Sequence, residues 1–67
     1  MSEIKKVSQE EAEKIIEKRI PLGLFYTISN GTYVGIYNSH GDAWTEDFKN
    51  LGSCKRWLVK WKNKRKI

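Results

Sequence analysis

The dipeptide Asn30-Gly31 constrains the fold of this 67-residue chain more than any other feature of its sequence. It stands between two runs of aromatic and β-branched residues, 25–28 and 32–37. A two-residue type I′ turn needs positive φ at both central positions, and Asn-Gly is strongly preferred there. The sequence therefore predicts a β-hairpin. In the register that this turn sets, the pairs on one face are Ser29 with Thr32, Thr27 with Val34, and Phe25 with Ile36.

A third strand is expected from Asp42 to about Asp47, after a turn over residues 38–41. If the loop has three residues, Ile36 pairs with Trp44, and Trp44 then shares the face of Phe25 and Val34. We take that face as the core, although a loop one residue longer or shorter moves Trp44 to the other face, because side chains alternate along a strand. We call the other face the tyrosine face, and it carries Leu24, Tyr26, Ile28, Tyr33 and Tyr37.

A helix is expected on each side of these strands. Ser8 and Glu11 have the spacing of a capping box, and Pro21 disfavours a helical residue before it, so the first helix should cover residues 8–19. The second helix should begin near Ser53, which is a good N-cap residue. Its apolar stripe has the spacing i, i+3, i+4, i+7 and consists of Cys54, Trp57, Leu58 and Trp61.

The predicted fold class is α+β, in the order α-β-β-β-α. It is a three-stranded antiparallel meander packed against N-terminal and C-terminal helices, which cover one face of the sheet. We expect one domain over residues 1–67, with a basic C-terminal tail at about 62–67.

The sequence shows no catalytic constellation. His40 is the only histidine and lies in a predicted turn, whereas Cys54 is the only cysteine and lies on an apolar stripe, so we expect it to be buried. A single cysteine allows no intrachain disulfide, and no apolar run approaches the roughly 20 residues that span a bilayer. We therefore expect a cytoplasmic protein that is not an enzyme and that uses no metal, cofactor or membrane.

The net charge of +5 is concentrated at one end of the chain. Residues 1–20 sum to zero and residues 21–54 sum to −2, whereas residues 55–67 carry seven bases and no acid. Clustered cations attract phosphates through counterion release, which favours a small non-enzymatic nucleic-acid-binding or regulatory module for DNA or RNA. The competing interpretation is a solvated tail that keeps the protein soluble. The candidate phosphate contacts are Lys55, Arg56, Lys60, Lys62, Lys64, Arg65 and Lys66.

The tyrosine face supports an alternative function. Either the N-terminal helix covers Tyr26, Tyr33 and Tyr37, or these side chains form a contact surface, since so small a protein rarely leaves a large apolar patch in water. Aromatic patches serve protein interfaces and also stack on unpaired bases. The alternative hypothesis is therefore a protein-binding module that uses this aromatic face.

Three resemblances follow from these patterns. The pattern of three antiparallel strands and a helix over about residues 23–61, with Ala43–Phe48 leading into Lys55–Leu58, resembles the DNA-binding modules of ethylene-response factors and the arm-binding domains of integrases, which implies DNA binding. The α-β-β-β-α order, with Gly52–Arg56, resembles a double-stranded RNA-binding domain. The residue pattern of Gly23–Leu58 is similar to that of small uncharacterised proteins of Gram-positive phages and mobile elements. This resemblance implies no known activity, but it implies that the protein-binding module of the alternative hypothesis would be a phage-encoded modulator of a host protein.

Overall fold

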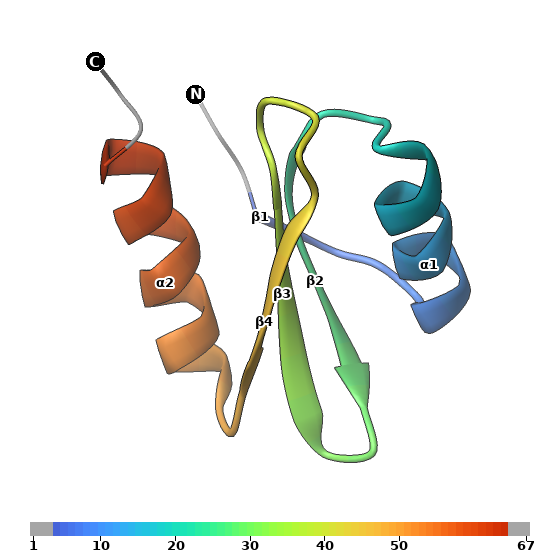
Figure 1. The fold of residues 1–67 in the computed structure, drawn as a ribbon. Helices are drawn as coiled ribbons and strands as arrows, with labels where there is room; N and C mark the ends of the chain where they lie inside the picture. Colours follow the sequence, from blue (N-terminus) through green and yellow to red (C-terminus); the bar gives the residue numbers. More distant parts are fainter. Residues whose placement is uncertain (1–3, 65–67) are drawn as a thin grey trace.

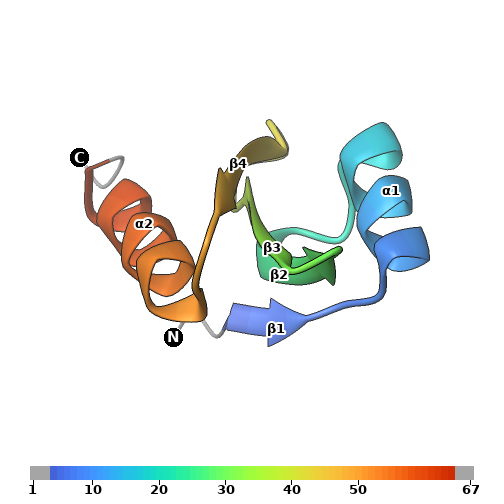
Figure 2. The same ribbon diagram turned by 90° about the horizontal axis from the view of Figure 1, so that it is seen from below.

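The computed structural model describes residues 4–64, with side chains described as far as residue 61. A four-stranded sheet in the order β1-β2-β3-β4 separates two helices, which lie on opposite sides of it (Figures 1 and 2). We call these sides the α1 side and the α2 side. The elements are β1 (Ile4–Lys6), α1 (Gln9–Lys18), β2 (Gly23–Ser29), β3 (Thr32–Asn38), β4 (Trp44–Phe48) and α2 (Leu51–Lys64).

The predicted α+β class is confirmed, with two helices and consecutive antiparallel strands β2, β3 and β4. Two details of the predicted architecture are wrong. The sheet has a fourth strand, β1, and the helices cover opposite faces. The physical reason for the second error is that both faces of the sheet are apolar, so each face needs its own cover.

The hairpin of β2 and β3 forms as the Asn-Gly turn predicts. Asn30 and Gly31 both have positive φ, at 51° and 79°. The strands pair Ser29 with Thr32 and Phe25 with Ile36, which is the expected register. The local turn chemistry therefore determines which side chains of the hairpin face α1 and which face α2.

Strand β1 was not predicted from the sequence. It is three residues long and pairs in parallel with β2, so that Ile4 lies beside Leu24 and Lys5 lies beside Phe25. The Val7 amide continues the contact by donating to the Tyr26 carbonyl at 2.9 Å. A strand with a single apolar residue followed by two lysines has no recognisable alternation, which explains why the pattern gives no signal.

Helix α1 begins and ends as the sequence predicts. The Ser8 hydroxyl accepts from the Glu11 amide at 3.0 Å, and the Glu11 carboxylate accepts from the Ser8 amide at 3.0 Å. The helix ends at Arg19, which adopts a left-handed conformation with φ 61°. Ala12 and Ile15 are buried against the sheet, and with Val7, Phe25 and Ile36 they form the hydrophobic cluster of the α1 side.

The face assigned to Trp44 is wrong. Trp44 pairs with Tyr37, and Ile36 pairs with Thr45, so the register of β4 is shifted by one residue from the expected pairing of Ile36 with Trp44. Trp44 therefore lies on the opposite face from the expected one, because a shift of one residue moves every side chain of a strand to the other face. Trp44 lies on the α2 side, where it stays 48% exposed and stacks on Trp61 with ring centroids 6.1 Å apart.

Helix α2 is anchored by its predicted apolar stripe. Cys54 and Leu58 are fully buried against Leu24 and Tyr37. The N-cap is Asn50 rather than the predicted Ser53, since the Ser53 amide donates to the Asn50 side-chain oxygen at 2.8 Å. The partly buried residues around this cluster are Ile4, Tyr26, Tyr33, Phe48, Trp57 and Trp61.

Gly35 allows α2 to approach the sheet closely. A Cβ atom at this position would lie 3.1 Å from the Cys54 sulfur and 3.1 Å from two ring carbons of Trp57. Such distances are too short for an unstrained side chain, so the missing Cβ makes room for the Trp57 ring. The ring comes from the helix and not from the neighbouring strand.

Candidate nucleic-acid interface

The outward side of α2 is the strongest concentration of exposed cations on an element that the core holds in place. Cys54 and Leu58 are 0% exposed, so the sheet fixes the rotation of the helix about its own axis. Lys55, Arg56 and Lys60 are exposed as a result. Arg56 and Lys60 are one turn apart, which places them as neighbours on the helix surface.

No acid neutralises this surface from within the helix. Residues 51–64 contain no Asp or Glu. Arg56 donates to the Ser53 hydroxyl at 3.4 Å, and none of the three cations forms an ion pair with a described residue. The exposed acids Glu46 and Asp47 belong to β4. The outward side of α2 therefore keeps its positive charge available for an external anion.

The remaining predicted phosphate contacts lie at the C-terminus. Lys62 and Lys64 belong to the last turns of α2, but their side chains lie outside the described residues. Arg65 and Lys66 lie outside the described residues altogether. The structure thus places Lys55, Arg56 and Lys60 on one helix, and the other four stay sequence-based candidates.

The three tyrosines proposed as a contact surface lie between the sheet and α2. Tyr37 is buried, while Tyr26 and Tyr33 are half-buried and pack against the cluster of the α2 side. We expected either the N-terminal helix or a partner to cover them, whereas the C-terminal helix does so. The chain itself therefore covers part of the surface that a partner would need on this side.

His40 and Cys54 lie in different surroundings, since His40 is exposed and Cys54 is buried. His40 is exposed in the loop before β4, with its ring 6.4 Å from that of Tyr37. Among the described residues, no three side chains of the metal-binding types come together. Neither of the described helices is long and apolar enough to cross a membrane.

Burial should make the Cys54 thiol unreactive. Burial raises the pKa of this thiol, and the positive charge of Lys55 opposes that shift. We expect a thiol reagent to label the native protein about a hundredfold more slowly than the denatured chain, because only rare opening exposes the thiolate. The free energy of unfolding should also fall as the pH rises above the ordinary thiol pKa of about 8.5, since the unfolded chain ionises first. Equal labelling rates with and without denaturant would contradict the burial of Cys54.

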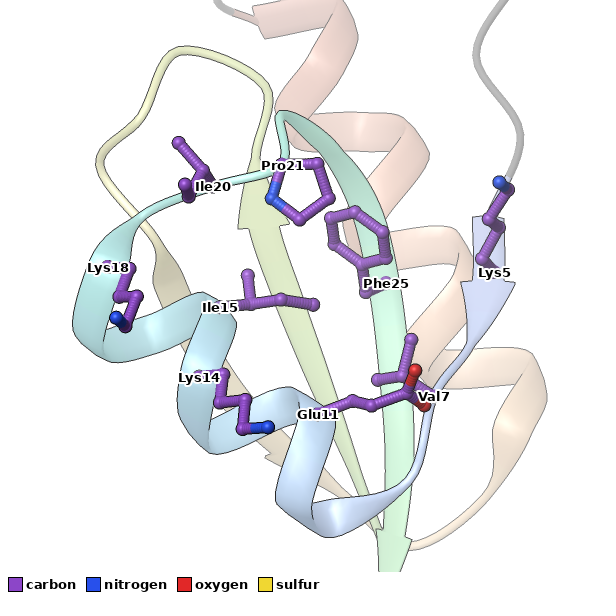
Figure 3. Close-up of a pocket in the computed structure, with 9 residues that line it drawn as sticks. All are labelled: Lys5, Val7, Glu11, Lys14, Ile15, Lys18, Ile20, Pro21 and Phe25. Atoms are coloured by element: carbon purple, nitrogen blue, oxygen red, sulfur yellow. The ribbon is translucent and has the colours of Figure 1, made fainter.

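A second basic feature escaped the sequence analysis. Lys14 and Lys18 stand one turn apart on α1 and line a groove whose other rim carries Lys5 (Figure 3). Glu13 and Glu17, which have the same spacing, do not line it. The position of Lys14 and Lys18 on one flank of α1, apart from Glu13 and Glu17, is a signal that could have been found by drawing the helix as a wheel.

Comparison with known proteins gives no match for this chain. No protein-family model, no curated protein and no solved structure was found to match it. The functional argument therefore rests on the geometry, burial and charge of the described residues.

Proposed function

We propose that the protein is a small nucleic-acid-binding module that contacts phosphates through the outward side of α2. The observation that carries this proposal is the division of α2 into two sides. One side is packed on the sheet by Cys54 and Leu58, and the other presents Lys55, Arg56 and Lys60 without an acid in the same helix.

The packing of α2 on the sheet through Cys54 and Leu58 distinguishes this surface from a solvated basic tail. A 14-residue helix is about 21 Å long and holds its exposed cations at fixed spacings. Each phosphate that such a cation neutralises releases condensed counterions, which drives binding without regard to base sequence. The module would therefore bind many sequences with similar affinity, unless further contacts read the bases.

The alternative of protein binding through the tyrosines receives no support from a free surface. Tyr37 is buried, and α2 packs over the side of the sheet that carries Tyr26 and Tyr33. A partner would have to displace α2 and expose its apolar stripe. We therefore carry only the nucleic-acid hypothesis forward.

A pair of matched triple variants tests the proposal. The first replaces Lys55, Arg56 and Lys60 with glutamine, and the second replaces Lys5, Lys14 and Lys18 with glutamine, so that both lose three positive charges. Fluorescence anisotropy with labelled duplex DNA, single-stranded DNA and duplex RNA should be measured between about 50 and 200 mM salt. On duplex DNA, the first variant should reduce the slope of log K against log salt by about 2.7, at about 0.9 for each lost phosphate contact.

The second variant should leave that slope nearly unchanged. Equal effects of the two variants would mean that only net charge matters and that α2 is not the interface. A salt-independent affinity of the unmodified protein, or no binding to any of the three nucleic acids at low salt, would overturn the proposal. Circular dichroism of each variant would show that the fold is intact.

A further inference from the structure

The groove beside α1 has an apolar floor that the chain leaves partly uncovered. It has a volume of about 530 Å³ and lies between α1, β1, β2 and the segment before β2 (Figure 3). Ile15 and Phe25 form its buried base, and both belong to the hydrophobic cluster of the α1 side. Ile20 also lines the groove and is 62% exposed. An apolar ligand could therefore be covered from below without disturbing the core.

The rim of the groove is positively charged on two sides. Lys14 and Lys18 project from α1, whereas Lys5 projects from β1, on the same face of the sheet as Phe25 (Figure 3). All three lysines are exposed, and none forms an ion pair with a described residue. The rim thus carries two neighbouring lysines on α1 and a third lysine on the opposite side, in β1.

The one acid that lines the groove is already engaged. The Glu11 carboxylate accepts from the Ser8 amide at 3.0 Å as part of the capping box at the start of α1. This contact holds the carboxylate at the end of the groove where the helix begins. The balance of charge over the groove is therefore positive, which excludes a cationic ligand and favours an anionic one.

We propose that this groove binds a single-chain amphiphile with a carboxylate head, with its apolar chain on Ile15, Ile20 and Phe25. The head would lie beside Lys14 and Lys18, which are one turn apart on α1, and their ammonium groups would donate charge-assisted hydrogen bonds to the carboxylate, with Lys5 adding positive charge from the other side of the groove. The volume falls within the range of about 300–1,000 Å³ that is typical of small-molecule sites. A small hydrophilic anion would leave the floor uncovered, and an uncharged chain would gain no electrostatic attraction from the lysines. This proposal does not depend on nucleic-acid binding by α2.

Titration with short fatty acids tests the site. Octanoate, decanoate and laurate, each kept below its micelle concentration, should shift the amide resonances of Val7, Ile15 and Phe25 in NMR spectra of the intact protein. Affinity should rise about fourfold for each added CH₂ until the floor is covered, which corresponds to about 0.8 kcal/mol per CH₂. Dodecyltrimethylammonium, which has the same chain as laurate and a cationic head, should bind at least tenfold more weakly.

The two triple variants also test this site, but here the variant of Lys5, Lys14 and Lys18 is the test and the variant of Lys55, Arg56 and Lys60 is the control. The glutamine variant of Lys5, Lys14 and Lys18 should bind laurate at least tenfold more weakly, whereas the variant of Lys55, Arg56 and Lys60 should bind it as the unmodified protein does. Ile20→Ser should flatten the dependence of affinity on chain length, because Ile20 is exposed and its replacement removes floor without emptying the core. Equal binding of the cationic amphiphile, equal loss in both triple variants, or shifts confined to residues of α2 would each overturn the proposal.

Discussion

Replacing Tyr37 with alanine is expected to destabilise the protein by about 3–5 kcal/mol, the usual cost of emptying a large aromatic core site. Tyr37 is 1% exposed and is the largest fully buried side chain among the described residues. Its ring lies between the sheet and α2, with the ring of Trp61 at 6.1 Å between centroids. A chain of this length has a total stability of about 3–10 kcal/mol, so the variant should be largely unfolded or close to it at 37 °C. Thermal melting followed by circular dichroism measures the effect.

Trp44→Ala is the matched control for that prediction. Trp44 pairs directly with Tyr37 across β3 and β4 and lies on the same side of the sheet, but it is 48% exposed. The sequence predicts it in the core, with a cost of 3–5 kcal/mol, whereas the structure lowers the expected cost to about 1–2 kcal/mol. A larger loss of stability for Trp44→Ala than for Tyr37→Ala would mean that the observed register of β4 is wrong.

The parts of the fold that the sequence predicts are those with a local cause. The Asn30-Gly31 turn and the capping box of Ser8 and Glu11 each involve residues within a few positions of one another, so their geometry follows from backbone preferences and short hydrogen bonds. The face of Trp44 instead depends on the length of the loop before β4. A one-residue shift of the register reverses the assignment, and no turn residue specifies that register.

The placement of the helices on opposite faces could not be predicted from either helix alone. Each helix has one apolar stripe, which fits either side of a sheet. Gly35 distinguishes the sides, because its missing Cβ allows the Trp57 ring to approach β3. Recognising that fit requires knowing which helix faces Gly35, and this knowledge comes only from the assembled fold.

The two candidate sites also differ in how far the sequence alone reveals them. The cations of α2 are adjacent in the sequence, so a charge count identifies them. The lysines of the groove come from β1 and α1, and β1 carries no recognisable strand pattern. Lys5 joins Lys14 and Lys18 only through the parallel pairing of β1 with β2, which a sequence pattern does not reveal.

Asn38→Ala is expected to destabilise the protein by about 2–4 kcal/mol, although Asn38 is polar and contributes little apolar area. The side chain is 0% exposed. Its Nδ2 donates to the Pro21 carbonyl at 2.8 Å, and its Oδ1 accepts from the Ala43 amide at 3.0 Å. Alanine would leave both backbone groups without this partner, and an unsatisfied buried polar group costs about 1–3 kcal/mol.

The same two hydrogen bonds explain how the end of β3 positions the strand that follows. Through these bonds, Asn38 links the segment before β2 to Ala43, the residue before Trp44. Ala43 adopts a positive φ of 53°, which a non-glycine residue rarely adopts without support from its neighbours. In Asn38→Ala, the Ala43 amide should therefore exchange its hydrogen with solvent much faster than in the unmodified protein, and the Trp44 resonances should broaden. Ser39→Ala is the control, because Ser39 is half-buried and makes no side-chain hydrogen bond with a described residue. If Asn38→Ala cost no more stability than Ser39→Ala and left the exchange of Ala43 unchanged, Asn38 would not be what holds this loop.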